Sequence, residues 1–76
     1  MKELIEYIAK SIVNAPDDVV VTEEIDEEEG AKFTLQVADD DKGRVIGKQG
    51  RIAAAIRTLI RVKAAKAGTR ASLEIL

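Results

Sequence analysis

The residues with the clearest chemical potential lie in the stretch RVIGKQGR, residues 44–51. Gly47 and Gly50 bracket only two residues, Lys48 and Gln49, and an arginine stands on either side. Glycine allows the positive φ or the crowded backbone that a sharp reversal between two helices requires. A helix that begins near Gly50 exposes unpaired N–H groups and the positive end of its dipole. Together with the basic side chains, these features predict a site for an anion.

The basic residues of this stretch belong to a division of charge along the chain. Residues 1–41 hold three lysines against thirteen acidic residues, a net charge of −10, whereas residues 42–76 hold nine basic residues against Glu74, a net charge of +8. This division predicts one face for an anionic partner and another that repels it. The alternative is that the two halves neutralise each other in the fold. The most acidic stretch, residues 23–29, is expected at a solvated hairpin tip.

Two helices must position the glycine pair. A short helix is expected over residues 41–46, where the aspartates at 39–41 can cap its N-terminus, and Gly47 ends it. From Arg51 onward an apolar repeat and three consecutive alanines predict a longer helix that stops at Gly68. The residues that recur at steps of three and four are the apolar Ile52, Ala55, Ile56, Leu59 and Ile60, followed by Lys63.

The remaining elements complete an α+β domain. A helix is expected over residues 2–14, and Pro16 then favours a turn. Alternating apolar and polar residues predict three strands, at 19–25, 32–37 and 70–76. The two aromatic residues, Tyr7 and Phe33, lie at spacings typical of a core. The predicted order is α-β-β-α-α-β in a single domain over residues 1–76, with a three-stranded sheet covered by three helices.

Several function classes find no support in these residues. The chain has neither cysteine nor histidine, so the usual thiol nucleophile and general base are missing. A P-loop from Gly43 is one residue short, with Gln49 where serine or threonine should stand, and an EF-hand counted from Asp39 would need glutamate in place of Gly50. We expect no enzyme, no metal and no cofactor. The composition is typical of a soluble globular protein, and a cytoplasmic location is expected because no leader or membrane-spanning segment is evident.

The run from Val45 to Gly50, VIGKQG, resembles the signature of KH domains, Val/Ile-Ile-Gly-x-x-Gly with a basic residue in the variable pair. The element order resembles type II KH domains, the bacterial topology, over essentially the whole chain. The length, the upstream NAPDDV and the block DKGRVIGKQGR make the chain similar to the small stand-alone bacterial KH proteins of the KhpA type.

This resemblance implies which residues contact RNA. The loop from Gly47 to Gly50 would grip the sugar-phosphate backbone of about four unpaired nucleotides, whose bases lie in an apolar groove. Leu35 or Val37 from the adjoining strand would contribute to that groove. The positions that match RNA-binding residues of the family are Arg44, Val45, Ile46, Gly47, Lys48, Gln49, Gly50, Arg51 and Ile52. For the apolar members, plain core packing is the alternative.

Arg57 and Arg61 form a further basic pair. They lie one helical turn apart, a like-charge arrangement that costs roughly a few tenths of a kcal/mol unless something acidic offsets it. The alternatives are phosphate farther along an RNA strand, the acidic half of a neighbouring subunit, or plain solvent.

Two functions of different classes follow. The first is a single-stranded RNA-binding protein with weak, salt-sensitive affinity, because aromatic side chains for base stacking are nearly absent. The resemblance adds a role as a post-transcriptional regulator or RNA chaperone that affects cell-envelope growth and cell shape. It also implies a homodimer or a complex with a larger Jag-type KH protein. The second is a protein-interaction subunit that assembles with a second KH protein. No membrane partner is expected.

Overall fold

A computed structural model describes all 76 residues of the chain. In chain order, the helices and strands are α1 (Lys2–Ile12), β1 (Val20–Asp26), β2 (Gly30–Gln36), α2 (Lys42–Ile46), α3 (Arg51–Lys66) and β3 (Ala71–Ile75). Single 3₁₀ turns join several of them: η1 (Pro16–Asp18), η2 (Asp39–Asp41) and η3 (Lys48–Gly50). This order confirms the predicted α+β arrangement.

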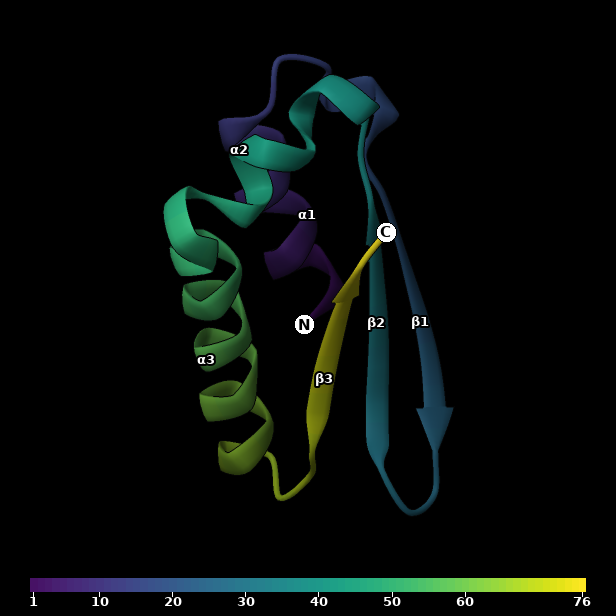
Figure 1. The fold of residues 1–76 in the computed structure, drawn as a ribbon. Helices are drawn as coiled ribbons and strands as arrows, with labels where there is room; N and C mark the ends of the chain where they lie inside the picture. Colours follow the sequence, from purple (N-terminus) through teal and green to yellow (C-terminus); the bar gives the residue numbers. More distant parts are fainter.

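The sheet has the strand order β1-β2-β3, which the sequence pattern left open. Strand β1 pairs with β2 in the antiparallel sense, with Val21 opposite Leu35. Strand β3 pairs with β2 in the parallel sense, with Phe33 opposite Leu73. Parallel neighbours require a long crossover connection, and α2, η3 and α3 supply it. The glycine pair therefore lies in the middle of this crossover, and the helices lie on one face of the sheet (Figure 1).

The core forms between that face and the helices. Alternate residues of β2, namely Ala31, Phe33 and Leu35, are buried, whereas the residues between them face the other side of the sheet. Ile5 of α1 and Ile60 of α3 are fully buried against this row. Burial of each such large side chain contributes about 1.5–3 kcal/mol, so the centre of β2 holds both long helices in place.

Helix α1 departs from the sequence prediction in two respects. It ends at Ile12, two residues earlier than expected, because Val13 already has extended dihedral angles (φ −96°, ψ 159°). The prediction that Tyr7 belongs to the core is wrong, since this side chain is 73% exposed. Ile5 and Ala9 are one turn apart and point inward, which turns Tyr7, midway between them, toward solvent.

Helix α3 ends as the sequence predicted. Gly68 has φ +75°, and its N–H bonds to the carbonyl oxygen of Ala65 while the N–H of Thr69 bonds to that of Ala64. This pair of bonds is the Schellman arrangement that satisfies the last carbonyl groups of a helix. None of the helices is both long and apolar enough to cross a membrane.

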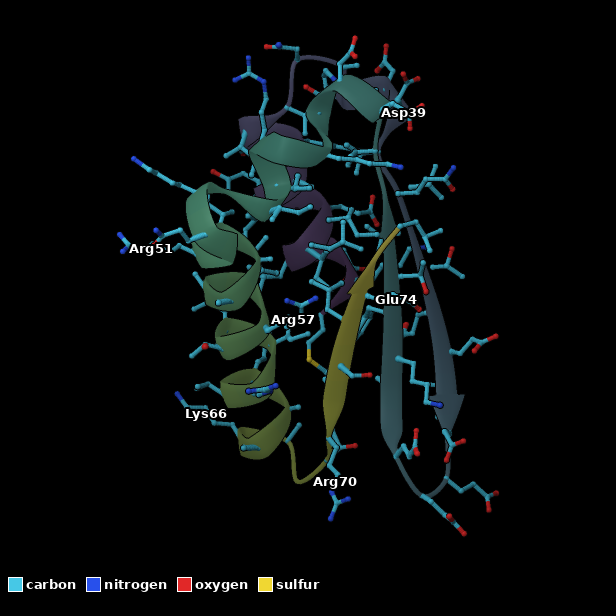
Figure 2. All side chains as sticks on the ribbon, in the orientation of Figure 1. Asp39, Arg51, Arg57, Lys66, Arg70 and Glu74 are labelled. Atoms are coloured by element: carbon cyan, nitrogen blue, oxygen red, sulfur yellow. The ribbon has the colours of Figure 1, made fainter.

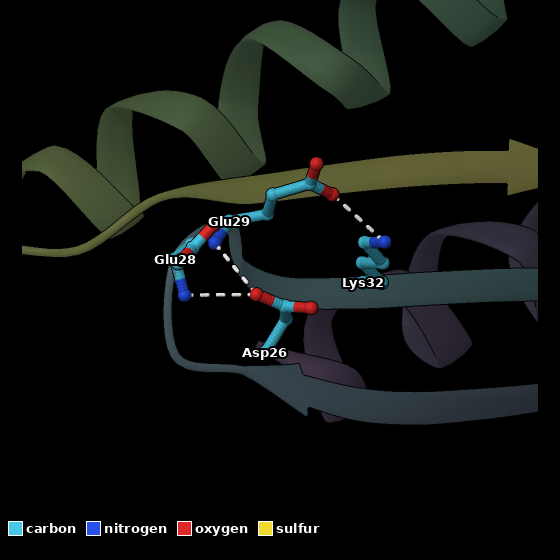
Figure 3. A network of polar contacts seen from close by, with 4 residues as sticks. All are labelled: Asp26, Glu28, Glu29 and Lys32. Carbon is cyan, nitrogen blue, oxygen red and sulfur yellow. Dashed lines mark hydrogen bonds and ion pairs between the residues drawn. The ribbon is translucent and has the colours of Figure 1, made fainter.

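The hairpin tip between β1 and β2 is acidic and exposed, as expected. Asp26 Oδ1 accepts hydrogen bonds from the main-chain N–H groups of Glu28 (2.8 Å) and Glu29 (3.0 Å), and Glu29 forms an ion pair of 2.7 Å with Lys32 (Figure 3). The N–H of Glu29, then that of Glu28, lowers the pKa of the Asp26 carboxyl below its usual 3.8. The hydrogen bond and charge of Glu29 raise the pKa of Lys32 above its usual 10.5. These contacts order the turn.

Candidate nucleic-acid interface

The loop between α2 and α3 reverses direction through an unusual run of backbone angles. Gly47 has φ 77° and ψ 173°, a region that is open essentially to glycine alone, and Gly50 has φ 73° and ψ 14°. A Cβ atom on Gly47 would lie 2.6 Å from Cγ1 of Ile52 and 2.9 Å from its main-chain nitrogen. A Cβ on Gly50 would meet nothing within 4 Å. Gly47 therefore serves both the turn and a close approach, whereas Gly50 serves the turn alone.

Gln49 adopts a left-handed conformation between these two glycines. Its φ of 58° and ψ of 27° make it the one residue other than glycine with positive φ in the chain. Such a conformation costs an L-residue about 1–2 kcal/mol. The side chain is exposed, and its Oε1 accepts a 3.3 Å hydrogen bond from Arg51. The loop is thus a strained, surface-exposed segment whose shape the surrounding helices impose.

The main chain of this loop is open to a ligand. The N–H of Gly50 bonds to the carbonyl oxygen of Gly47 (3.1 Å), and the N–H of Gly47 bonds to that of Gly43 (2.9 Å). No side chain caps the N-terminus of α3, and none bonds to the main-chain N–H of Lys48 or Gln49. The positive end of a 16-residue helix is therefore uncapped, and it follows two residues whose main-chain amides bond to no side chain.

The three basic side chains around the loop are all exposed, and they differ in their partners. Arg44 lies with its Nε 3.5 Å from Oδ1 of Asp41. Lys48 and Arg51 form no ion pair. Arg51 extends away from α3 into solvent (Figure 2). The structure thus brings the three predicted basic residues around one loop, and only Arg44 among them has an acidic partner.

Asp41 has a role that the sequence did not indicate. We predicted that the aspartates at 39–41 cap α2, but no side chain caps that helix. Asp41 is instead 1% exposed, and its two carboxylate oxygens accept hydrogen bonds from the main-chain N–H groups of Asn14 (3.1 Å) and Ala15 (3.0 Å). It ties the segment after α1 to the start of α2, while its ion pair holds Arg44. Asp39 and Asp40 are exposed, as solvated residues should be.

The predicted apolar residues separate into surface and core. Ile46 is 40% exposed and Ile52 is 38% exposed, and they lie on either side of Gly47 in the chain. Val45 is fully buried and belongs to the core, in agreement with the packing alternative. Leu35 and Val37 are also buried in that core, so the suggestion that these strand residues line a groove is wrong for their side chains. An apolar surface beside the loop is therefore limited to the two isoleucines.

Helix α3 has three different faces. Its buried positions are Ala53, Ile56, Ile60 and Ala64, so of the predicted repeat only Ile56 and Ile60 belong to the inner face. Ile52, Ala55 and Leu59 of that repeat lie on the surface, and Leu59 is 50% exposed. On a third face, Arg57 points toward β3 (Figure 2) and donates a 3.2 Å hydrogen bond from Nε to the carbonyl oxygen of Leu73. Arg57 thus has a partner that none of the predicted alternatives included.

The division of charge survives in the folded chain. The basic residues of positions 42–76 that pair with carboxylates are Lys42 and Arg44, and both pairs are local contacts with Asp39 and Asp41. The other seven of the nine form no ion pair. Internal neutralisation of the two halves is therefore wrong. Arg70, which the sequence analysis did not single out, belongs to this unpaired set and shares a hollow with Arg61.

Comparisons with known proteins agree with this architecture. The family described as "KhpA/KhpB, KH domain" matches residues 2–75. A protein of Clostridium acetobutylicum named RNA-binding protein KhpA is 51% identical over 76 residues, which is 100% of both chains. A protein of the same name from Caldanaerobacter subterraneus is 49% identical over 76 residues, which is 100% of both chains. Another from Listeria monocytogenes is 47% identical over 76 residues, which is 100% of this chain and 99% of that protein. No solved structure matches the chain significantly. The chain is a KH-domain protein and not an enzyme, and it belongs to the KhpA/KhpB family of KH domains.

Proposed function

We propose that this protein binds single-stranded RNA through the loop from Gly47 to Gly50. The observation that carries the proposal is the open main chain of this loop, with uncapped amides at the start of α3 and no carboxylate beside Lys48 or Arg51. Relatives of nearly identical length are named RNA-binding proteins, which supports the same choice of ligand.

The loop has a simple physical mechanism for holding a nucleotide strand. The glycines present no side chain, so a sugar-phosphate backbone can approach the main chain closely. The amide groups and helix dipole attract phosphate, and Lys48, Arg51 and Arg44 add formal charge. Ile46 and Ile52 offer apolar contact to a ribose or base next to Gly47. About four nucleotides are held in this way.

Binding of this kind is weak and depends little on base sequence. Phosphate contacts carry no sequence information, and the exposed aromatic residue, Tyr7, lies on α1 rather than at the loop. A protein with these properties fits a post-transcriptional regulator or RNA chaperone in the cytoplasm, which contacts many transcripts briefly. Its affinity for RNA falls steeply with salt, because binding releases cations from the RNA and this release is less favourable when the salt concentration is high.

The proposal is tested by reversing the charge of the loop. In Lys48→Asp/Gln49→Asp, the net charge of the loop falls by three units, and binding of a fluorescein-labelled 8-nucleotide RNA should be abolished in anisotropy titrations. The matched control, Lys2→Asp/Gln36→Asp, makes the same change of charge on α1 and on the open face of the sheet. Circular dichroism establishes that both variants are folded. Wild-type affinity in the loop variant would contradict the proposal.

A second observation favours assembly as well as RNA binding. Exposed apolar residues line one face of α3 at the spacing of a heptad seam: Ile52, Ala55, Leu59 and Val62. We infer that a second copy of the chain packs its own stripe against this one, since a two-fold axis pairs identical surfaces. The alternative partner for this stripe is a larger Jag-type KH protein.

The basic residues next to the stripe make the assembly testable. Arg51, Lys63 and Lys66 repel their counterparts across the two-fold axis, so added salt should strengthen the dimer while it weakens RNA binding. Sedimentation velocity should show a dimer that Leu59→Asp converts to a monomer, whereas Tyr7→Asp, on the exposed face of α1, leaves it intact. A wild-type monomer at all concentrations would exclude self-association and leave the stripe to the larger KH protein.

A further inference from the structure

A basic hollow lies at the end of α3 that is remote from the glycine loop. Its volume is about 350 Å³, and it is lined by Arg61, Ala65, Thr69, Arg70 and Ala71. Arg61 belongs to α3, whereas Arg70 lies in the turn that leads into β3, so two elements each contribute an arginine to the lining. No acidic side chain lines this hollow.

The two arginines have no partner within the protein. Neither forms an ion pair, and neither side chain takes part in a hydrogen bond. The main chain of Arg70 is nevertheless held, because its carbonyl oxygen accepts a 2.9 Å hydrogen bond from the N–H of Ala31 in β2. Both guanidinium groups are therefore uncompensated within the protein and available to a bound anion.

The lining suits a phosphate group. A guanidinium presents a rigid fork of N–H donors that matches phosphate geometry. Ala65 and Ala71 are small enough to leave room between the two arginines, and the Thr69 hydroxyl is a further donor. A second hollow shares Thr69 and Arg70 in its lining but also contains four acidic residues, Glu23, Asp26, Glu27 and Glu28, which repel a phosphate. An anion therefore favours the hollow that Arg61 lines.

The hollow lies on the same face of α3 as the glycine loop. Ala54 lies four residues after Gly50 and seven before Arg61, which places all three along one side of the helix axis. Arg57 precedes Arg61 by one turn on this side and points toward β3 (Figure 2). From Gly50 to Arg61 the helix rises about 16 Å. Between the loop and the basic pair, the small Ala54 leaves a path for a strand.

We propose that the hollow between Arg61 and Arg70 binds a backbone phosphate of the same RNA strand, beyond the nucleotides held at the glycine loop. This inference rests on the proposed function, and it gives the protein a footprint longer than four nucleotides. Ala55, Leu59 and Val62 of the exposed apolar stripe lie on a different face of α3 from Arg61, so an RNA strand and a second copy of the chain share only Ile52, at the start of the helix.

The test compares RNA length and charge position. Arg61→Gln/Arg70→Gln removes both guanidinium groups, and Lys2→Gln/Lys10→Gln removes the same charge from α1. Both variants and the wild type are titrated with 4- and 8-nucleotide RNAs at about 50 and 200 mM salt. The arginine variant should bind the 8-nucleotide RNA roughly tenfold more weakly than the control, and its salt slope should be smaller by about 0.7 for each phosphate that it no longer neutralises. Its binding of the 4-nucleotide RNA should equal that of the control.

Each other outcome is decisive. If the two glutamine variants bind the 8-nucleotide RNA equally, while Lys48→Asp/Gln49→Asp still abolishes binding, the hollow takes no phosphate and the glycine loop remains the site. If the arginine variant loses the 4-nucleotide RNA as strongly as the longer one, its effect is a general loss of positive charge and the inference fails. If the wild type binds neither RNA, the proposed function fails with it.

Discussion

Arg57 joins α3 to the open edge of β3 by donating its Nε–H to the carbonyl oxygen of Leu73, at 3.2 Å. Strand β3 is an edge strand, so its outward carbonyl groups have no neighbouring strand to pair with. The arginine satisfies one of them and covers part of that edge. It also fixes the spacing between the helix and the sheet on the side where we propose that RNA passes.

The first prediction concerns this hydrogen bond. Arg57→Gln should lower the free energy of unfolding by about 1 kcal/mol, because the variant cannot make this part-buried bond from a charged donor. Urea denaturation measures the change. Arg61→Gln, on the same face without a protein partner, should leave stability within about 0.5 kcal/mol of the wild type. Equal destabilisation in the two variants would mean that the bond to Leu73 contributes nothing of its own.

The second prediction separates the two glycines of the loop. Gly47→Ala should destabilise the fold by about 2–4 kcal/mol, because alanine is strained at φ 77°, ψ 173° and its Cβ collides with Ile52. Gly50→Ala should cost only about 1–2 kcal/mol, since its Cβ meets open space. Adding Ile52→Ala to Gly47→Ala should recover part of the stability in a double-mutant cycle. Strictly additive effects would mean that Cγ1 of Ile52 contributes nothing to the clash, which would then come from the Cβ and main-chain nitrogen that alanine retains.

The third prediction concerns the buried carboxylate. Asp41→Ala leaves the main-chain N–H groups of Asn14 and Ala15 without their acceptors and should cost about 1–3 kcal/mol of stability. Asp41→Asn retains one side-chain oxygen and should lie between alanine and the wild type. Asp40→Ala is the matched control, because Asp40 is exposed, and thermal unfolding should place it near the wild type.

The fourth prediction is a pH dependence at the hairpin tip. Hydrogen bonds from Glu29 and Glu28 lower the folded-state pKa of Asp26 below 3.8. A carboxyl whose pKa is lower when folded stabilises the fold above its unfolded pKa, and that contribution disappears as the pH falls through the folded value. Asp26→Asn should therefore be less stable than the wild type at pH 7, and the difference should shrink below pH 3.8. If wild type and Asp26→Asn differ in stability by the same amount at both pH values, the hydrogen bonds to the ionised Asp26 carboxylate are not the cause of the difference.

The local pattern of residues was enough to predict most of the architecture. Alternation along 32–37 and the i, i+4 spacing in α1 and α3 are properties of short stretches, so they located the elements to within a few residues. The stop at Gly68 and the reversal at Gly47 and Gly50 also follow from local dihedral requirements. The KH signature lies in six consecutive residues and needs no tertiary information.

Other features depended on how distant segments pack. Tyr7 and Leu59 carry apolar surface at helical spacing, yet both are exposed, because the sheet is only three strands wide and covers one side of each helix. Asp41 was indistinguishable from Asp39 and Asp40 until the segment after α1 came within hydrogen-bond distance of it. The periodicity of the sequence carries no information about such a contact between distant segments.

The sequence by itself therefore determined the element order, the glycine reversal and the division of charge, since each depends on residues close together in the chain. Tertiary structure alone decided the strand order, the burial of Val45 beside the exposed Ile46, and the hollow that Arg61 and Arg70 both line. The physical reason is that a side chain becomes buried, paired or free only when another segment of the chain packs against it or leaves it uncovered.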